Sequence, residues 1–96
     1  MVFEAKWNGE VIAKAEKVEQ VEGNAYFAPE NVNQKFLTPS SHTSVCGWKG
    51  DCSYYNVVVN GKTNENAAWV YKNPKPAAQN IKGFIAFWKG VEVVNH

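Results

Sequence analysis

The stretch HTSVCGWKGDCSYY, residues 42 to 55, brings together side chains that could carry out thiol chemistry. Cys46 lies four residues after His42 and three residues before Lys49. A thiolate becomes a nucleophile when a base removes its proton and a cation stabilises it, so Cys46 with His42 as base is a candidate catalytic pair. Nothing nearby in the sequence supplies a third group to orient His42, and a buried cysteine is commonly a small hydrophobic side chain. We therefore favour a packed, non-catalytic Cys46 and keep the thiol-dependent enzyme as an alternative.

Cys46 and Cys52 flank a five-residue segment with two glycines, which could bring both sulfur atoms together at a turn. A disulfide between them needs an oxidising compartment. A zinc site would recruit His42 and His96, but structural zinc usually shows closely spaced cysteine pairs, and chain ends fray. We expect reduced cysteines, no bound metal and no cofactor.

Aromatic residues make up 14% of the chain, which is high for 96 residues. Most of them must fill the core, because each buries a large area. Trp69 and Tyr71 are two residues apart and so lie on the same side of one expected strand, while Tyr54 and Tyr55 point to opposite faces of another. One aromatic face could therefore line a cleft, and an apolar cleft with a few polar groups is the usual form of a binding site.

Polar residues that could complete this cleft lie on neighbouring segments. Lys49 and Lys75 are expected at its rim, where an ammonium group would attract an anionic or carbonyl group of a ligand. Gly50 would let the backbone approach the ligand closely, and the sequence NPKP at 73–76 would form a rigid edge. The predicted ligand-binding residues are Trp48, Lys49, Gly50, Tyr54, Trp69, Tyr71 and Lys75.

Short strands separated by turns must position these residues, and about seven are expected. Asn-Gly pairs at 8–9 and 60–61 follow apolar runs, and such pairs favour tight hairpin turns because both residues accept positive φ. Further turns are expected at Gly23–Asn24 and Lys89–Gly90. The clearest strand covers residues 52–59, and residues 84–88 and 91–94 form a final pair of strands.

Two short helices are expected near residues 29–35 and 76–82, each with a proline in its first turn. A chain of 96 residues is predicted to form one domain, residues 1–96, with a single core. The expected fold class is all-β and mainly antiparallel. Its form would be a small pair of sheets or a partial barrel, and a β-tent is one such arrangement.

The charge and hydropathy of the chain argue against two classes of partner. Its ten basic residues are all lysines, against nine acidic residues. Nucleic-acid recognition relies on arginine and on a broad basic surface, so we expect no nucleic-acid partner. No apolar run approaches the ~18 residues that a membrane span needs, and the start, with Glu4, is unlike a signal peptide. We expect a cytoplasmic protein without a membrane partner.

Three blocks of the sequence are similar to one known family. VEGNAYFAPENVN, HTSVCGWKGDCSYY and NAAWVYKNPKPAAQNIKGFIAFWKGVEV resemble the family catalogued as domain of unknown function 427. The resemblance covers nearly the whole chain and implies a compact, mainly β, stand-alone cytosolic domain. A catalogue label connects the family with nucleotidyltransferases, but this chain has neither a Gly-Ser element followed by paired acidic residues nor a phosphate-binding loop. At the position of Cys52, the family pattern looks more like a small residue. This difference disfavours chemistry that needs both thiols.

The sequence therefore predicts a small binding module that holds a small molecule or a peptide in an aromatic-lined cleft with lysine side chains. It would act as a monomer or a weak homodimer. Two alternatives remain open, a thiol-dependent enzyme that uses Cys46 with His42, and a component that interacts or assembles through an exposed sheet edge.

Overall fold

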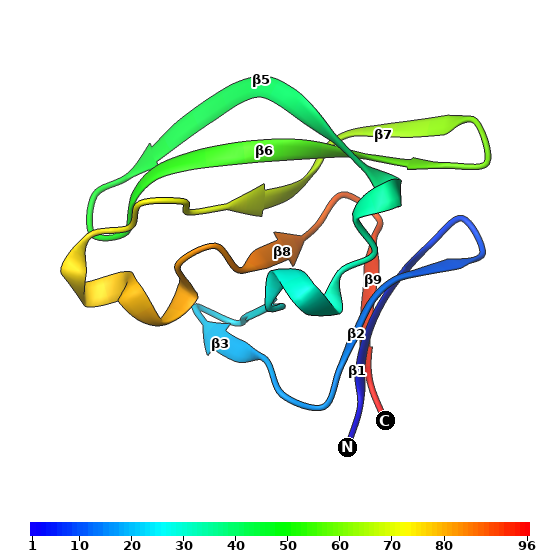
Figure 1. The fold of residues 1–96 in the computed structure, drawn as a ribbon, viewed down its shortest axis with the longest axis horizontal. Coiled ribbons are helices and arrows are strands. Elements are labelled where there is room, and N and C mark those ends of the chain that lie inside the picture. Colours follow the sequence, from blue (N-terminus) through cyan, green and yellow to red (C-terminus); the bar gives the residue numbers. More distant parts are fainter.

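The computed structural model describes residues 1–96, and its strands form three separate antiparallel sheets. The largest sheet has the order β5-β6-β7-β8, a second has the order β2-β1-β9, and β3 pairs only with β4. Figure 1 shows the four-stranded sheet above the other two, with the two chain ends side by side. The expectation of a mainly antiparallel all-β fold is confirmed. The sheets number three rather than two, and they do not close into a barrel.

The nine strands are three to ten residues long. They are β1 (Phe3–Trp7), β2 (Glu10–Ala15), β3 (Glu19–Val21), β4 (Asn24–Tyr26), β5 (Leu37–Cys46), β6 (Gly50–Val59), β7 (Lys62–Val70), β8 (Ile85–Phe87) and β9 (Glu92–Asn95). The sequence did not predict β5, which contains Pro39 and lies at a sheet edge, where a proline costs no hydrogen bond inside the sheet. The last two strands do not pair with each other, because β8 adds to β7 and β9 adds to β1.

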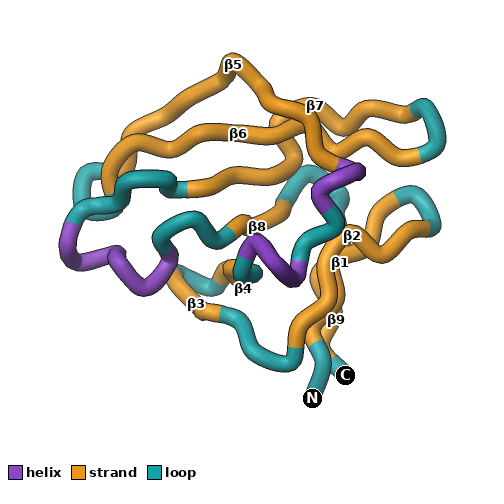
Figure 2. The backbone as a smooth tube through the Cα atoms, viewed as in Figure 1, coloured by secondary structure: helices purple, strands orange, loops and turns teal.

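The helical segments are short 3-10 helices. They are η1 (Pro29–Asn31), η2 (Gln34–Phe36) and η3 (Pro76–Ile81). Figure 2 places η3 on the connection between β7 and β8, and η1 and η2 before β5. The two predicted helices thus occur at the expected places, but the first is divided into two single turns. The structure contains no helix with the length and apolar character needed to cross a membrane.

Tight turns with positive φ join the hairpins. Asn8 and Gly9 have φ of 50° and 81°, and Asn60 and Gly61 have φ of 50° and 77°, as the Asn-Gly pairs predict. The turn predicted at Gly23–Asn24 is wrong by one residue. Glu22 and Gly23 carry the positive φ there, and residue 24 already belongs to β4.

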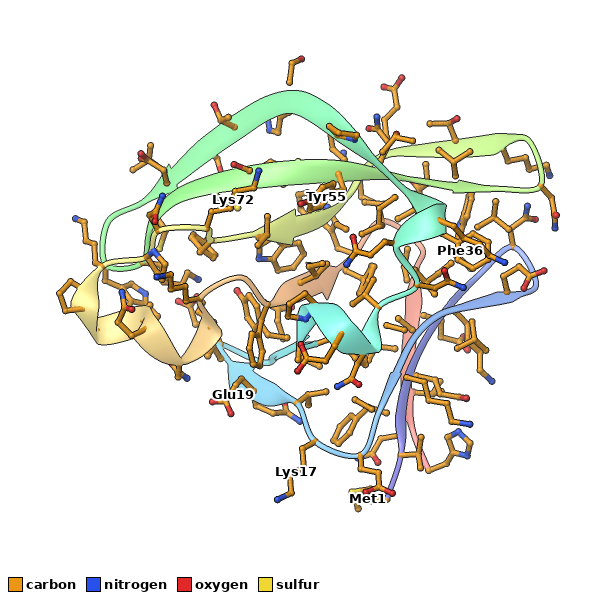
Figure 3. All side chains as sticks on the ribbon, in the orientation of Figure 1. Met1, Lys17, Glu19, Phe36, Tyr55 and Lys72 are labelled. Atoms are coloured by element: carbon orange, nitrogen blue, oxygen red, sulfur yellow. The ribbon has the colours of Figure 1, made fainter.

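The main core lies between the four-stranded sheet and the β2-β1-β9 sheet. Fourteen buried residues form it, among them Ile12, Phe27, Val57 and Val59. Tyr55 packs against this core from β6, and Figure 3 shows side chains filling the space between these layers. A smaller core of six buried residues lies beside it, and the candidate site is built on this second core.

The two chain ends are held together where β1 and β9 pair. The backbone of Val2 and the backbone of His96 exchange two hydrogen bonds, and the His96 imidazole lies 2.9 Å from the Glu4 carboxylate. That hydrogen bond, together with the ammonium groups of Lys6 and Lys14, holds the pKa of Glu4 below its usual value, although burial acts in the opposite direction.

Candidate functional site: an aromatic pocket

A pocket of about 270 Å³ opens beside the second core, and we call it the aromatic pocket. Its lining residues are Asn24, Tyr26, Lys49, Tyr54, Trp69, Tyr71 and Trp88. They come from β4, the turn before β6, β6 itself, the end of β7 with the residue after it, and the residue after β8. Five of the seven side chains are aromatic, so the walls are formed by rings and the polar groups are few.

The walls of the aromatic pocket are fixed by ring contacts and hydrogen bonds. Trp69 donates its indole N–H to the Tyr26 hydroxyl oxygen at 3.1 Å, with the two rings edge to face and 6.0 Å between centroids. Trp69 and Trp88 also meet edge to face, with their centroids 5.6 Å apart. Such geometry is the favoured one for aromatic pairs, and it holds the rings in defined orientations.

Tyr54 forms the outer wall. It pairs with Trp69 across β6 and β7, and its hydroxyl lies 2.9 Å from the Ser44 hydroxyl on β5. The Tyr54 ring lies 4.6 Å from the His42 ring and 6.4 Å from the Trp88 ring. Trp88 is 44% exposed, so this side of the pocket reaches the surface.

Lys49 lies in the interior rather than at the rim, which corrects the expectation from the sequence. It is only 6% exposed, and its ammonium group donates a hydrogen bond to the half-exposed carboxylate of Glu22. The same ammonium group lies 5.3 Å from the ring centroids of both Trp48 and Tyr71. Burial acts to lower the pKa of Lys49, but the hydrogen bond to Glu22 and the charge interactions around the ammonium group together raise it, so the cation is kept.

The hydroxyl groups of Tyr26 and Tyr71 stay protonated at neutral pH. Burial raises the pKa of both Tyr26 and Tyr71 above the usual value for a phenol. The Tyr26 oxygen accepts from Trp69, so its own proton can be donated elsewhere. Lys49 likewise has three N–H groups, of which Glu22 accepts one. Tyr26 and Lys49 can therefore both donate hydrogen bonds to a ligand.

Gly50 and Lys75 support the site instead of facing a ligand. Gly50 has φ of 108°, and a Cβ there would lie 3.5 Å from the backbone nitrogen of Lys75. That nitrogen donates to the carbonyl of Lys49 at 2.9 Å, and the Lys75 ammonium donates to the carbonyl of Gly47 at 2.6 Å. The segment after β7 thus clamps the turn that carries Lys49.

Trp48 does not line the aromatic pocket. It is 42% exposed, and its indole N–H donates to the carboxylate of Glu22 at 3.4 Å. Of the seven predicted residues, Lys49, Tyr54, Trp69 and Tyr71 lie in the lining, and Trp48, Gly50 and Lys75 lie beside it.

The two cysteines are free and belong to the second core. Cys52 is buried, and burial raises the pKa of its thiol. Cys46 is partly exposed and packs against the same core. The structure contains no hydrogen bond between Cys46 and His42, whose ring instead packs on Tyr54.

Sequence reasoning missed Asn24 and Tyr26, which reach the pocket from the β3-β4 hairpin, about 25 residues before Lys49. Their segment showed only a turn signal and an apolar run. Trp88 was one of the many aromatic residues of the chain, but nothing in the sequence pattern connected it with Trp69.

Fold and pocket together define a small all-β domain with an aromatic pocket that contains a buried lysine. A family model described as a domain of unknown function, DUF427, matches residues 2–95. The chain therefore belongs to the DUF427 family, as the resemblance of its sequence blocks indicated. No curated protein matches the chain.

Proposed function

We propose that this protein is a binding module whose aromatic pocket takes a small planar group bearing an oxygen acceptor, such as a carbonyl or a carboxylate. One observation carries the proposal. The buried Lys49 ammonium lines the same pocket as five aromatic side chains, and it is kept charged in the interior. A buried charge is costly unless it is paired. Glu22 accepts one hydrogen bond from the Lys49 ammonium group, so part of the donor capacity of Lys49 is left for a ligand.

The walls support a planar ligand rather than a long flexible one. Aromatic rings offer stacking and edge contacts to another ring, and a volume of about 270 Å³ is at the small end for ligand pockets. The ligand would be either a small molecule or one side chain of a larger partner. The donors Lys49 and Tyr26 would select against a ligand cation, which Lys49 would repel.

A matched set of three probes tests the proposal: indole-3-acetate, indole-3-acetamide and tryptamine. They share one ring and differ in whether the short side chain accepts hydrogen bonds or carries an ammonium group. We expect the acetate and the acetamide to shift the indole N–H signals of Trp69 and Trp88 in proton–nitrogen correlation spectra, and to leave the signal of Trp7 unchanged. Tryptamine is expected to bind at least tenfold more weakly.

Two variants locate the binding. Lys49→Met retains the apolar stem and removes the ammonium group, so it should weaken the acetate most and tryptamine least. Glu16→Gln changes an exposed carboxylate outside the pocket and should leave all three affinities unchanged. Tighter binding of tryptamine, or signal changes at Trp7 alone, would refute the proposal.

The thiol-dependent enzyme and an interaction through a sheet edge stay predictions. The first would need Cys46 and His42 to approach each other, and the second could use β5, the exposed edge of the largest sheet. The identity of a partner, the monomeric or weakly dimeric state and a cytoplasmic location are likewise predictions.

A further inference from the structure

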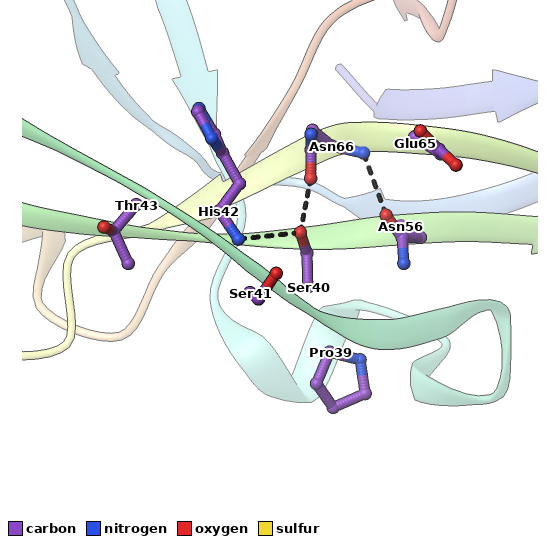
Figure 4. Close-up of a pocket in the computed structure, with 8 residues that line it drawn as sticks. All are labelled: Pro39, Ser40, Ser41, His42, Thr43, Asn56, Glu65 and Asn66. Atoms are coloured by element: carbon purple, nitrogen blue, oxygen red, sulfur yellow. Dashed lines mark hydrogen bonds between the residues drawn. The ribbon is translucent and has the colours of Figure 1, made fainter.

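A second hollow, of about 830 Å³, adjoins the aromatic pocket and is polar throughout. We call it the polar hollow. Its lining residues are Pro39, Ser40, Ser41, His42, Thr43, Asn56, Glu65 and Asn66. Figure 4 shows these residues on β5, β6 and β7, where the strands diverge from regular pairing.

Two interruptions of the sheet create the polar hollow. Between the pairs Pro39–Tyr55 and Thr43–Ser53, residues 40–42 of β5 stand opposite a single residue of β6. Between the pairs Tyr55–Ala68 and Val57–Asn64, residues 65–67 of β7 stand opposite Asn56 alone. Bulges of this kind re-aim side chains and are frequent beside binding sites.

The polar groups of the hollow are held in place before any ligand arrives. The Ser40 hydroxyl donates to Asn66 Oδ1 at 2.5 Å and accepts from the backbone N–H of His42 at 3.1 Å. The backbone N–H of Asn66 donates to Asn56 Oδ1 at 3.0 Å. Figure 4 traces these three hydrogen bonds as one chain across the sheet. Groups fixed in this way lose little conformational entropy on binding.

The chemistry of the lining matches hydroxyl groups. Serine, threonine, asparagine, histidine and glutamate side chains offer both donors and acceptors, as a sugar hydroxyl does. The lining has no lysine or arginine for a phosphate group, and Glu65 would repel one. The chain has no cluster of three histidine, cysteine or carboxylate side chains that could hold a metal ion.

The polar hollow and the aromatic pocket share a boundary. His42 lines the hollow and Tyr54 lines the aromatic pocket, and their rings lie 4.6 Å apart. Trp88 lines the aromatic pocket, and its indole N–H donates at 2.5 Å to the backbone oxygen of Asn66. Asn66 is one of the residues that line the hollow. A single ligand could therefore place a planar group on one side of this boundary and a hydroxylated group on the other.

We propose that the ligand is a glycoside, with its planar aglycone in the aromatic pocket and its sugar in the polar hollow. This inference rests on the proposed function of the aromatic pocket and adds the chemical class of the attached group. Asn56, Glu65 and Asn66, which line the hollow, bind the hydroxyl groups of the sugar. Linking the two parts makes the second contact intramolecular, which raises the affinity above that of either part.

The test compares 4-nitrophenol with a panel of 4-nitrophenyl glycosides of glucose, galactose, mannose and N-acetylglucosamine. Affinities are measured by titration followed in proton–nitrogen correlation spectra. We expect at least one glycoside to bind tenfold or more tightly than 4-nitrophenol, with added shifts at Asn56 and Asn66. Asn66→Gly should remove this gain without changing the affinity for 4-nitrophenol. Glycine accepts the φ of 58° at this position, so the variant removes the side chain without adding backbone strain.

The outcomes separate the two proposals. If 4-nitrophenol binds in the aromatic pocket and no glycoside binds more tightly, the glycoside inference is wrong and the proposed function stands. If neither 4-nitrophenol nor any glycoside binds, both are wrong. Glu65→Gln and Glu16→Gln form a matched pair, because only Glu65 lines the hollow. An equal effect of both substitutions on glycoside affinity would also overturn the inference.

Discussion

Replacing Lys49 with alanine should destabilise the protein substantially, although an exposed lysine would tolerate the change. Lys49 is 6% exposed, and its ammonium group lies 5.3 Å from the ring centroids of both Trp48 and Tyr71. Lys49→Ala removes three methylene groups and the ammonium group from this position. The surrounding rings cannot collapse fully into the space, because the clamp between Lys75 and Gly47 holds the turn in place.

The expected loss follows from the buried stem. At about 0.8 kcal/mol for each buried methylene, three of them contribute about 2.4 kcal/mol to the free energy of unfolding. Each ammonium–ring contact adds about 0.5–1 kcal/mol. With two such contacts we expect a total loss of about 3.4–4.4 kcal/mol. The stem alone lowers the melting temperature by roughly 10 °C or more for a domain of this size.

Chemical denaturation followed by circular dichroism measures this loss. Lys49→Met is the matched control, because methionine replaces most of the stem and lacks only the charge, so we expect it to cost less than half as much. A change within about ±0.5 kcal/mol for Lys49→Ala, the range of an exposed surface site, would refute the buried placement. Equal losses for both variants would show that the charge, not the stem, stabilises the fold.

Three further predictions concern stability and reactivity. The pKa of Glu4 is lower in the folded chain than its usual 4.5, so the contribution of Glu4 to stability is complete above pH 4.5 and is lost as the pH falls through the folded pKa. Below pH 4.5, the melting temperature of Glu4→Gln should therefore fall less steeply with pH than that of the unchanged protein. An unchanged slope would contradict this prediction. Because burial raises the pKa of the Cys52 thiol, Cys46 should react with Ellman's reagent at pH 8 well before Cys52. Equal reaction rates of the two thiols in the folded protein would contradict the buried position of Cys52. Gly61→Ala should lower the free energy of unfolding by about 1 kcal/mol in chemical denaturation, because φ at Gly61 is 77°. Gly47 has no positive φ and open space around it, so Gly47→Ala should be nearly neutral. Equal losses for the two variants would show that backbone conformation is not the cause.

The fold could be predicted from the sequence where local chemistry decides the structure. Asn8–Gly9 and Asn60–Gly61 define two hairpins because few other residue pairs accept positive φ twice in succession. The strand β5 escaped prediction because its residues are mostly polar, and Pro39 disfavours a strand unless it lies at an edge. Pairing β9 with β1 instead of β8 depends on contacts between the chain ends, which no local pattern encodes.

The candidate site was predictable where the alternation of a strand places residues together. Trp69 and Tyr71 were expected on one side of a strand, and both line the aromatic pocket. The burial of Lys49 could not be predicted, because it depends on Glu22 from a hairpin that is distant in sequence. Tyr26 reaches the site for the same reason, since β4 lies beside β8 through the bridge between Phe27 and Ile85.

The most direct test of the aromatic pocket is to measure intermolecular nuclear Overhauser effects between bound indole-3-acetate and the protein. We expect contacts from the probe's ring protons to the side chains of Trp69, Tyr54 and Trp88, and from its methylene protons to the Lys49 side chain. Contacts confined to side chains outside the aromatic pocket, such as Trp7, or no saturable binding of the probe, would show that the aromatic pocket is not the binding site.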